Sequence, residues 1–82
     1  QTDIIECKVH GDKKTSRLAG KSLTQISWPK SVSVAAIIRE NALISADGDC
    51  EIQVGDHLVL VLGDVKKLRE VEKLFQVSAD FF

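Results

Sequence analysis

The clearest signal along the chain is the alternation of apolar and polar side chains near its start. Residues 3–10 place an apolar side chain at every second position from Ile5 to Val9, with charged side chains between them. A period of two is typical of a β-strand with one solvated face. We therefore expect a first strand over residues 3–10.

Two later stretches are typical of strands with apolar side chains on both faces. Residues 31–39 alternate in a similar way, but both faces become apolar after Val34. Residues 57–62 contain five branched aliphatic side chains in succession. Strands of this kind need cover on two sides.

Turn residues connect these strands. Glu40-Asn41 predicts a tight turn, because Asn is one of the few residues that tolerates positive φ. A returning strand then starts at residues 43–44. We also expect a brief strand around residues 51–53.

Two segments favour helix. Ser22 can cap a short helical turn over residues 23–26, which ends before the proline at position 29. Asp64 is a favourable N-cap for a helix over about residues 65–75, where apolar side chains recur every three or four positions. The predicted fold class is α+β, with a small, mainly antiparallel β-sheet, a short helix and a long C-terminal helix on one face.

These helices can cover only one face of the sheet. Leaving four or five branched side chains exposed on the other face would forgo about 1.5–3 kcal/mol each, against a total stability of about 5–15 kcal/mol. We expect a partner chain to cover this face. The residues expected at this subunit interface are Val34, Ala36, Ile37, Val59 and Val61. The alternative is that Leu18, Trp28 and the tail at residues 81–82 fold over it.

Composition and charge narrow the class of protein. The 82 residues suit a single domain, 1–82, and 44% hydrophobic with 28% charged residues is ordinary for a soluble globular chain. A net charge of −1 excludes a general nucleic-acid surface.

The longest apolar runs are far shorter than the roughly 20 residues needed to span a bilayer. Two cysteines favour a reducing, cytoplasmic setting, and a start at Gln1 rather than Met leads us to expect a piece of a longer protein.

The sequence gives little support for a catalytic site or a metal site. Cys7, His10, Cys50 and His57 are zinc-ligand types, but positions 7 and 10 point to opposite faces of a strand. The acidic turn after position 46 lacks the Gly and Glu that an EF-hand loop requires. Cys50 and His57 flank one turn, as a nucleophile and base could, yet nothing else in the chain supplies an obvious substrate pocket. The five glycines form neither a dinucleotide nor a P-loop motif, so we expect no enzyme activity and no cofactor in this domain.

Four segments together resemble a known family. The strings "GKSLTQI", "VSVAAIIRENALISADGD", "EIQVGDHLVLVLG" and "VKKLREVEKLF" occur in this order, and the similarity covers nearly all of residues 1–77. They resemble the C-terminal regulatory domain of TrkA-type potassium uptake proteins. That domain is the C-terminal lobe of the RCK (regulator of potassium conductance) module.

The resemblance implies a cytoplasmic regulatory and assembly domain, peripheral to the inner face of the plasma membrane. It implies a homodimer or ring that gates a membrane-embedded potassium-translocating subunit through ligand-dependent rearrangement. In the family a Rossmann-like lobe binds NAD(H) or ATP, and this lobe is missing from the chain. The alternative is a stand-alone module of another cation transporter that binds a small effector, for example a cyclic dinucleotide.

The resemblance also implies a place for a small anionic effector. The residues that match the effector groove of cyclic-dinucleotide-binding relatives are Ile38, Arg39, Asn41 and Ile44. The Arg39 guanidinium suits a bidentate contact with a phosphate, and Asn41 offers amide donors beside it. The alternative is that Arg39 pairs with Glu40 or Asp47. The chain departs from these relatives at Ala46, where a proline helps to form the groove.

Overall fold

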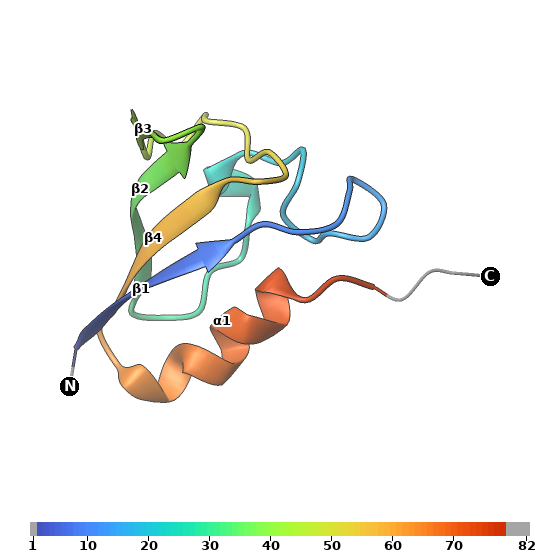
Figure 1. Ribbon diagram of the computed structural model, residues 1–82. Coiled ribbons are helices and arrows are strands. Elements are labelled where there is room, and N and C mark those ends of the chain that lie inside the picture. Colours follow the sequence, from blue (N-terminus) through green and yellow to red (C-terminus); the bar gives the residue numbers. More distant parts are fainter. Residues whose placement is uncertain (1, 79–82) are drawn as a thin grey trace.

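The computed structural model describes residues 2–78, which form a four-stranded sheet with one α-helix packed against it (Figure 1). The elements in chain order are β1 (Asp3–Lys8), the 3-10 helix η1 (Leu23–Gln25), β2 (Val32–Arg39), β3 (Ala42–Ser45), β4 (His57–Leu62), the 3-10 helix η2 (Val65–Lys67) and α1 (Leu68–Phe75). The strands are antiparallel and lie in the order β1-β4-β2-β3. The small antiparallel sheet that the sequence predicts is confirmed, and the last strand of the chain lies inside the sheet.

Strand β4 shows how the core is built. Leu58, Leu60 and Leu62 are at most 1% exposed, whereas the valines between them are half-buried. The leucines belong to one core cluster with Val71 of α1 and with apolar side chains of the loops. One face of the sheet is therefore covered by the chain's own helix and loops. We call the other face the open face.

A β-bulge in β2 changes which side chains face the core. The register passes from Val34 to Ala36 over a single step of β4, so Ala35 is an extra residue in β2. An extra residue reverses the alternation from that point on, because successive side chains point to opposite faces. The strict alternation expected over residues 31–39 is therefore wrong. After the bulge Ile37 faces the core and Ile38 lies on the open face.

The C-terminal helix begins where the sequence predicts, but it is short rather than long. The backbone N–H of Lys66 donates a hydrogen bond to Oδ1 of Asp64 at 3.0 Å, so Asp64 is the expected N-cap. The first turn, η2, is a 3-10 helix, and α1 itself contains 8 residues. Two turns are enough to bring Val71 into the core, where it is fully buried.

The connections differ from the prediction at one point. Glu40 and Asn41 have φ values of 51° and 66°, and they form the expected two-residue turn between β2 and β3. The strand expected around residues 51–53 does not form. Glu51 makes only an isolated bridge with Ser22.

The side chains considered as cover for the open face lie elsewhere. Leu18 belongs to the buried core, and Trp28 packs against that core while its Nε1–H donates to the Leu23 carbonyl at 3.2 Å. The tail at residues 81–82 lies outside the described residues. Within residues 2–78, the open face is therefore not covered by these side chains.

Candidate functional site

The open face carries exposed apolar side chains at both edges of the sheet. The register places Ile4 of β1 opposite Val61 of β4, and Leu43 of β3 opposite Ile38 of β2. Paired residues of an antiparallel sheet lie on the same face, so these side chains belong to one surface. Ile4 is 65% exposed and Leu43 is 75% exposed. Exposed apolar side chains that share one surface are typical of a docking surface.

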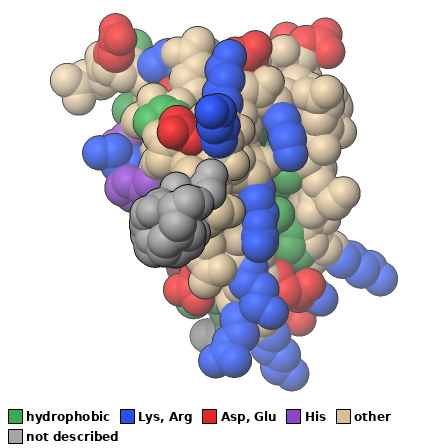
Figure 2. Space-filling view, turned by 90° about the vertical axis from the view of Figure 1, so that its right-hand side faces the viewer, with side chains coloured by type: hydrophobic (Ala, Val, Ile, Leu, Met, Phe, Trp, Pro, Cys, Tyr) green, Lys and Arg blue, Asp and Glu red, His purple; other side chains and the backbone are tan. Residues whose placement is uncertain are grey.

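The molecule looks different from the side shown in Figure 2. Lys and Arg side chains run down that side, and only small hydrophobic areas reach its surface where grey atoms do not cover it. The 3-10 helix η2 and α1 carry Lys66, Arg69 and Lys73 as exposed cations. Charged side chains, mostly Lys and Arg, therefore dominate this side, whereas exposed apolar side chains lie at both edges of the open face.

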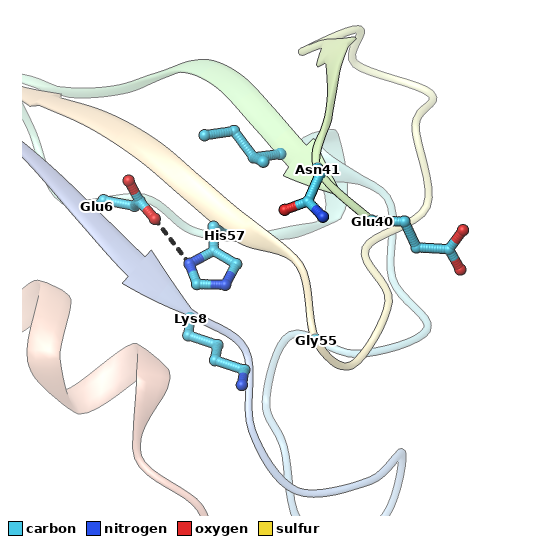
Figure 3. Close-up of a pocket in the computed structure, with 7 residues that line it drawn as sticks. Glu6, Lys8, Glu40, Asn41, Gly55 and His57 are labelled. Atoms are coloured by element: carbon cyan, nitrogen blue, oxygen red, sulfur yellow. Dashed lines mark ion pairs between the residues drawn. The ribbon is translucent and has the colours of Figure 1, made fainter.

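One end of the open face is hollowed (Figure 3). The hollow has a volume of about 410 Å³. It is lined by Glu6, Lys8, Ile38, Glu40, Asn41, Gly55 and His57. These residues come from β1, from the end of β2 with the turn that follows it, and from the start of β4 with the turn before it. Three parts of the chain that are far apart in sequence thus meet around one small space.

The hollow contains charges of both signs. Glu6 and His57 point toward one another in Figure 3, and Nδ1 of His57 lies 2.7 Å from Oε2 of Glu6. Lys8 lies opposite His57 in the register of β1 and β4. Asn41 adds an amide, held in place by a left-handed backbone. The carboxylate of Glu40 also lines the hollow. Donors beside an apolar side chain suit a small ligand that has both polar and planar apolar parts.

The structure brings together two of the four residues expected to hold an effector. Ile38 and Asn41 line the hollow. Ile44 lies opposite Ile37 and packs against the core. Arg39 follows Ile38 and lies on the covered side of β2, so neither Arg39 nor Ile44 lines the hollow.

Arg39 is engaged within the chain. Its Nε and Nη2 donate to the two carboxylate oxygens of Asp56 at 2.8 and 2.9 Å, and Nη2 also donates to the Glu51 carbonyl at 2.9 Å. The partner is therefore Asp56, and not Glu40 or Asp47 as the sequence suggests. The hydrogen bonds that Arg39 donates to the Asp56 carboxylate raise the pKa of Arg39 above its usual value, although burial opposes this.

The expected subunit-interface residues divide between the two faces. Ala36, Val59 and Val61 lie on the open face. Val34 pairs with Leu60 and packs against the core, and Ile37 is 0% exposed. The bulge moves only Ile37, which follows it, whereas Val34 precedes the bulge and faces the core because it pairs with the buried Leu60. Ile37 is therefore a core residue and cannot contact a partner.

Sequence reasoning missed Glu6 and Lys8 as site residues. Their alternation with the apolar positions of residues 3–10 places them on the solvated face of the first strand. The alternation does not show which other strand pairs with the first one. Only the pairing of β1 with β4 brings Glu6 and Lys8 next to His57.

The four residues considered as zinc ligands do not come together among the described residues. Across the described part of the chain, no three His, Cys, Asp or Glu side chains come together as a metal site, and this includes Cys7, His10, Cys50 and His57. Both cysteines are free thiols. Burial, with smaller effects from Glu72 and Glu6, raises the pKa of Cys7, which makes its thiolate scarcer. No helix among residues 2–78 has the length and apolar character to cross a membrane.

Solved structures share this fold. A structure of the RCK_C domain dimer of S. agalactiae BusR in complex with c-di-AMP superposes with a TM-score of 0.70 and 25% identity, and the match covers 88% of this chain and 93% of that one. The RCK C domain of the potassium transport protein KtrA, also in complex with c-di-AMP, gives a TM-score of 0.70 at 24% identity, covering 89% of this chain and 82% of that one. The fold is therefore that of an RCK C-terminal domain.

Sequence comparison assigns the family within this class. The model of the TrkA-C domain matches residues 13–76. The Trk system potassium uptake protein TrkA of Halomonas elongata is 34% identical over 80 residues, or 98% of this chain, and that of Haemophilus influenzae is 38% identical over 79 residues, or 96%. The chain belongs to the TrkA-C domain family, a family of regulatory domains. It spans only 18% and 17% of the length of these two relatives.

Proposed function

We propose that this chain is the regulatory lobe of a potassium uptake protein, that it pairs with a second copy over its open face, and that it senses a small anionic effector in the hollow. The observation that carries the proposal is the position of the hollow. It lies within an exposed apolar surface, and its donors are Lys8, His57 and Asn41. Pairing over this surface would cover the hollow and exclude water from a bound effector.

The exposed edges of the open face support pairing with a second copy. A copy seated on this face would bury Ile4, Leu43 and the half-exposed valines of β4, at about 25 cal/mol for each Å² of apolar surface. A solved structure of similar fold is an RCK_C dimer. A self-complementary patch of this kind is typical of a twofold homodimer.

The chemistry of the hollow supports an effector that carries phosphate. The ammonium group of Lys8 and the imidazole of His57 can bind phosphate oxygens, and Asn41 can hydrogen-bond a base edge. Ile38 offers an apolar surface for a ring. Two solved structures of similar fold contain c-di-AMP, so this cyclic dinucleotide is the first probe.

The relatives support a place for the lobe in a larger potassium uptake system. We place it at the inner face of the plasma membrane, where pairing and effector binding would rearrange a ring and gate a membrane-embedded potassium-translocating subunit. Any NAD(H) or ATP site of the parent protein would lie in a Rossmann-like lobe, because this chain has no glycine-rich nucleotide motif.

Sedimentation analysis of the 82-residue chain tests the pairing. We expect a dimer, and we expect Leu43→Ser to raise its dissociation constant by at least tenfold. Leu68→Ser is the matched control, since Leu68 is a 40% exposed leucine of α1 outside the open face. A monomeric wild-type chain at millimolar concentration, or equal effects of the two substitutions, would contradict pairing over the open face.

Calorimetric titration with c-di-AMP tests the effector site. Asn41→Gly removes the amide but keeps a residue that accepts the left-handed backbone, and we expect it to weaken binding at least fivefold. Ser31→Gly is the matched control, because Ser31 also has a positive φ, is exposed, and does not line the hollow. Equal affinities of the two variants would contradict a role for the hollow.

A further inference from the structure

The three walls of the hollow meet beneath it at one buried residue. Asp56 is 1% exposed and does not line the hollow. Its sequence neighbours Gly55 and His57 do line it. The wall formed by the start of β4 is therefore attached to Asp56 through the backbone.

The wall formed by the turn between β2 and β3 is attached to Asp56 through Arg39. The guanidinium donates hydrogen bonds to both carboxylate oxygens, at 2.8 and 2.9 Å. Arg39 directly precedes Glu40 and Asn41, which line the hollow. A bidentate pair of this kind fixes orientation as well as distance.

The wall formed by β1 is attached through the backbone. The N–H of Val9 donates to the Asp56 carbonyl at 2.8 Å, and the N–H of Gly55 donates to the Val9 carbonyl at 2.9 Å. Val9 directly follows Lys8. The backbone N–H of Gln53 also donates to Oδ2 of Asp56, at 2.9 Å, and closes the turn before β4.

The geometry points to Asp56 as the positioning residue of the effector hollow, which holds the turn that carries Asn41 and the end of β1 against the start of β4 through its carboxylate and backbone. The inference rests on the proposed function, because it assigns a role at the same site. Asp56 cannot touch an effector, since it is buried under the walls. Arg39 likewise acts through Asp56 and not as a phosphate ligand. Groups held at fixed separations bind a rigid ligand without an ordering cost.

Arg39→Lys is the variant that tests this inference. Lysine keeps the charge next to Asp56 but lacks the planar fork that grips both oxygens. Asp56→Asn is the stronger variant, although its loss of a buried ion pair can prevent folding. Val71→Ala is the control for stability alone, because Val71 of α1 is fully buried in the core and does not line the hollow. All affinities are measured at a temperature at which each variant is folded.

Titration with c-di-AMP gives the first readout. We expect Arg39→Lys to weaken binding at least tenfold and Val71→Ala to change it less than twofold. In the Arg39→Lys background, Asn41→Gly should no longer matter, because Asn41 is already out of position. Equal effects of Arg39→Lys and Val71→Ala, or full additivity with Asn41→Gly, overturn the inference.

The ligand-free chain gives a second readout that separates this inference from the proposed function. If the wild-type chain binds no c-di-AMP, the proposed effector fails but the positioning role can still be measured. Amide NMR signals of Lys8, Asn41 and Gly55 should all shift in Arg39→Lys, while that of Ile4 at the far end of β1 stays in place. Unshifted signals at Lys8 and Asn41 overturn the positioning role.

Discussion

His57 and Glu6 are diagonal neighbours on the open face, with Nδ1 of the imidazole 2.7 Å from Oε2 of the carboxylate. The pair joins the two strands that the sequence separates most, β4 and β1. It also places a negative charge inside a hollow whose other ionisable groups include Lys8. In the chain without a ligand, Glu6 therefore competes with any anion for His57.

Glu6→Gln should strengthen the binding of an anionic effector. The pair is half-exposed, so its loss should change the free energy of unfolding by less than about 1 kcal/mol. Removal of the carboxylate leaves His57 and Lys8 free for phosphate, and we expect the dissociation constant for c-di-AMP to fall severalfold. Glu70→Gln is the control, because it removes an exposed ion pair with Lys67 outside the hollow. Weaker binding by Glu6→Gln would show that the carboxylate assists the effector.

Ile37 and Ile38 are adjacent in sequence but lie on opposite faces, and their alanine variants should behave differently. Ile37→Ala leaves a cavity in the core and should cost about 2–5 kcal/mol of unfolding free energy. Ile38→Ala should cost the isolated chain clearly less and should instead weaken pairing and effector binding. Urea unfolding at low concentration and sedimentation distinguish the two effects. Similar losses of stability would contradict the bulge at Ala35.

Asp56 should make stability depend on pH in the acid range. Burial favours the neutral acid, but the hydrogen bonds from Arg39 and from the Gln53 N–H outweigh it and hold the pKa of Asp56 below its usual value. A folded-state pKa below the unfolded value of about 3.9 means that the ion pair stabilises the fold fully above that pH. This stabilisation is lost as the pH falls further, through the folded-state pKa. Urea unfolding of wild type and Asp56→Asn at pH values from about 7 to 2.5 should give curves that converge in acid; parallel curves would contradict the assignment.

Gly11→Ala should destabilise the chain more than Gly55→Ala. Both glycines have positive φ, 86° and 94°, so either alanine carries backbone strain of about 1–2 kcal/mol. At Gly11 the new Cβ would also lie 2.6 Å from Oγ1 of Thr15 and 3.0 Å from a methyl group of Val77. At Gly55 nothing lies within 4 Å. Thermal unfolding of the two variants makes the comparison, and equal losses would show that backbone strain alone decides the effect.

Local patterns predicted the elements well where neighbouring residues determine them. Positive φ at Glu40 and Asn41 follows from turn chemistry, and the cap at Asp64 follows from the first turn of a helix. The bulge at Ala35 left no such signal, because Ala and Ile are acceptable on either face. One extra residue was enough to move Ile37 from the expected interface into the core.

The site was predictable only in part, because it depends on contacts between distant segments. Ile38 and Asn41, which line the hollow, were named because their segment resembles the effector groove of related domains. The pairing of β1 with β4 brings in Glu6 and Lys8, and no local pattern specifies that pairing. The partner of Arg39 lies 17 positions away along the chain, so the guanidinium was assigned to a ligand when it belongs to Asp56.

The position of β4 inside the sheet has a consequence for biosynthesis. Strand β1 is the first strand of the domain to be made, but its neighbour in the sheet, β4, is the last strand to be made. Pairing between such distant segments is slow because a long loop must close first. Until translation has passed Leu62, β1 therefore has no partner strand. During that time the hairpin of β2 and β3 exposes strand edges that chaperones can bind.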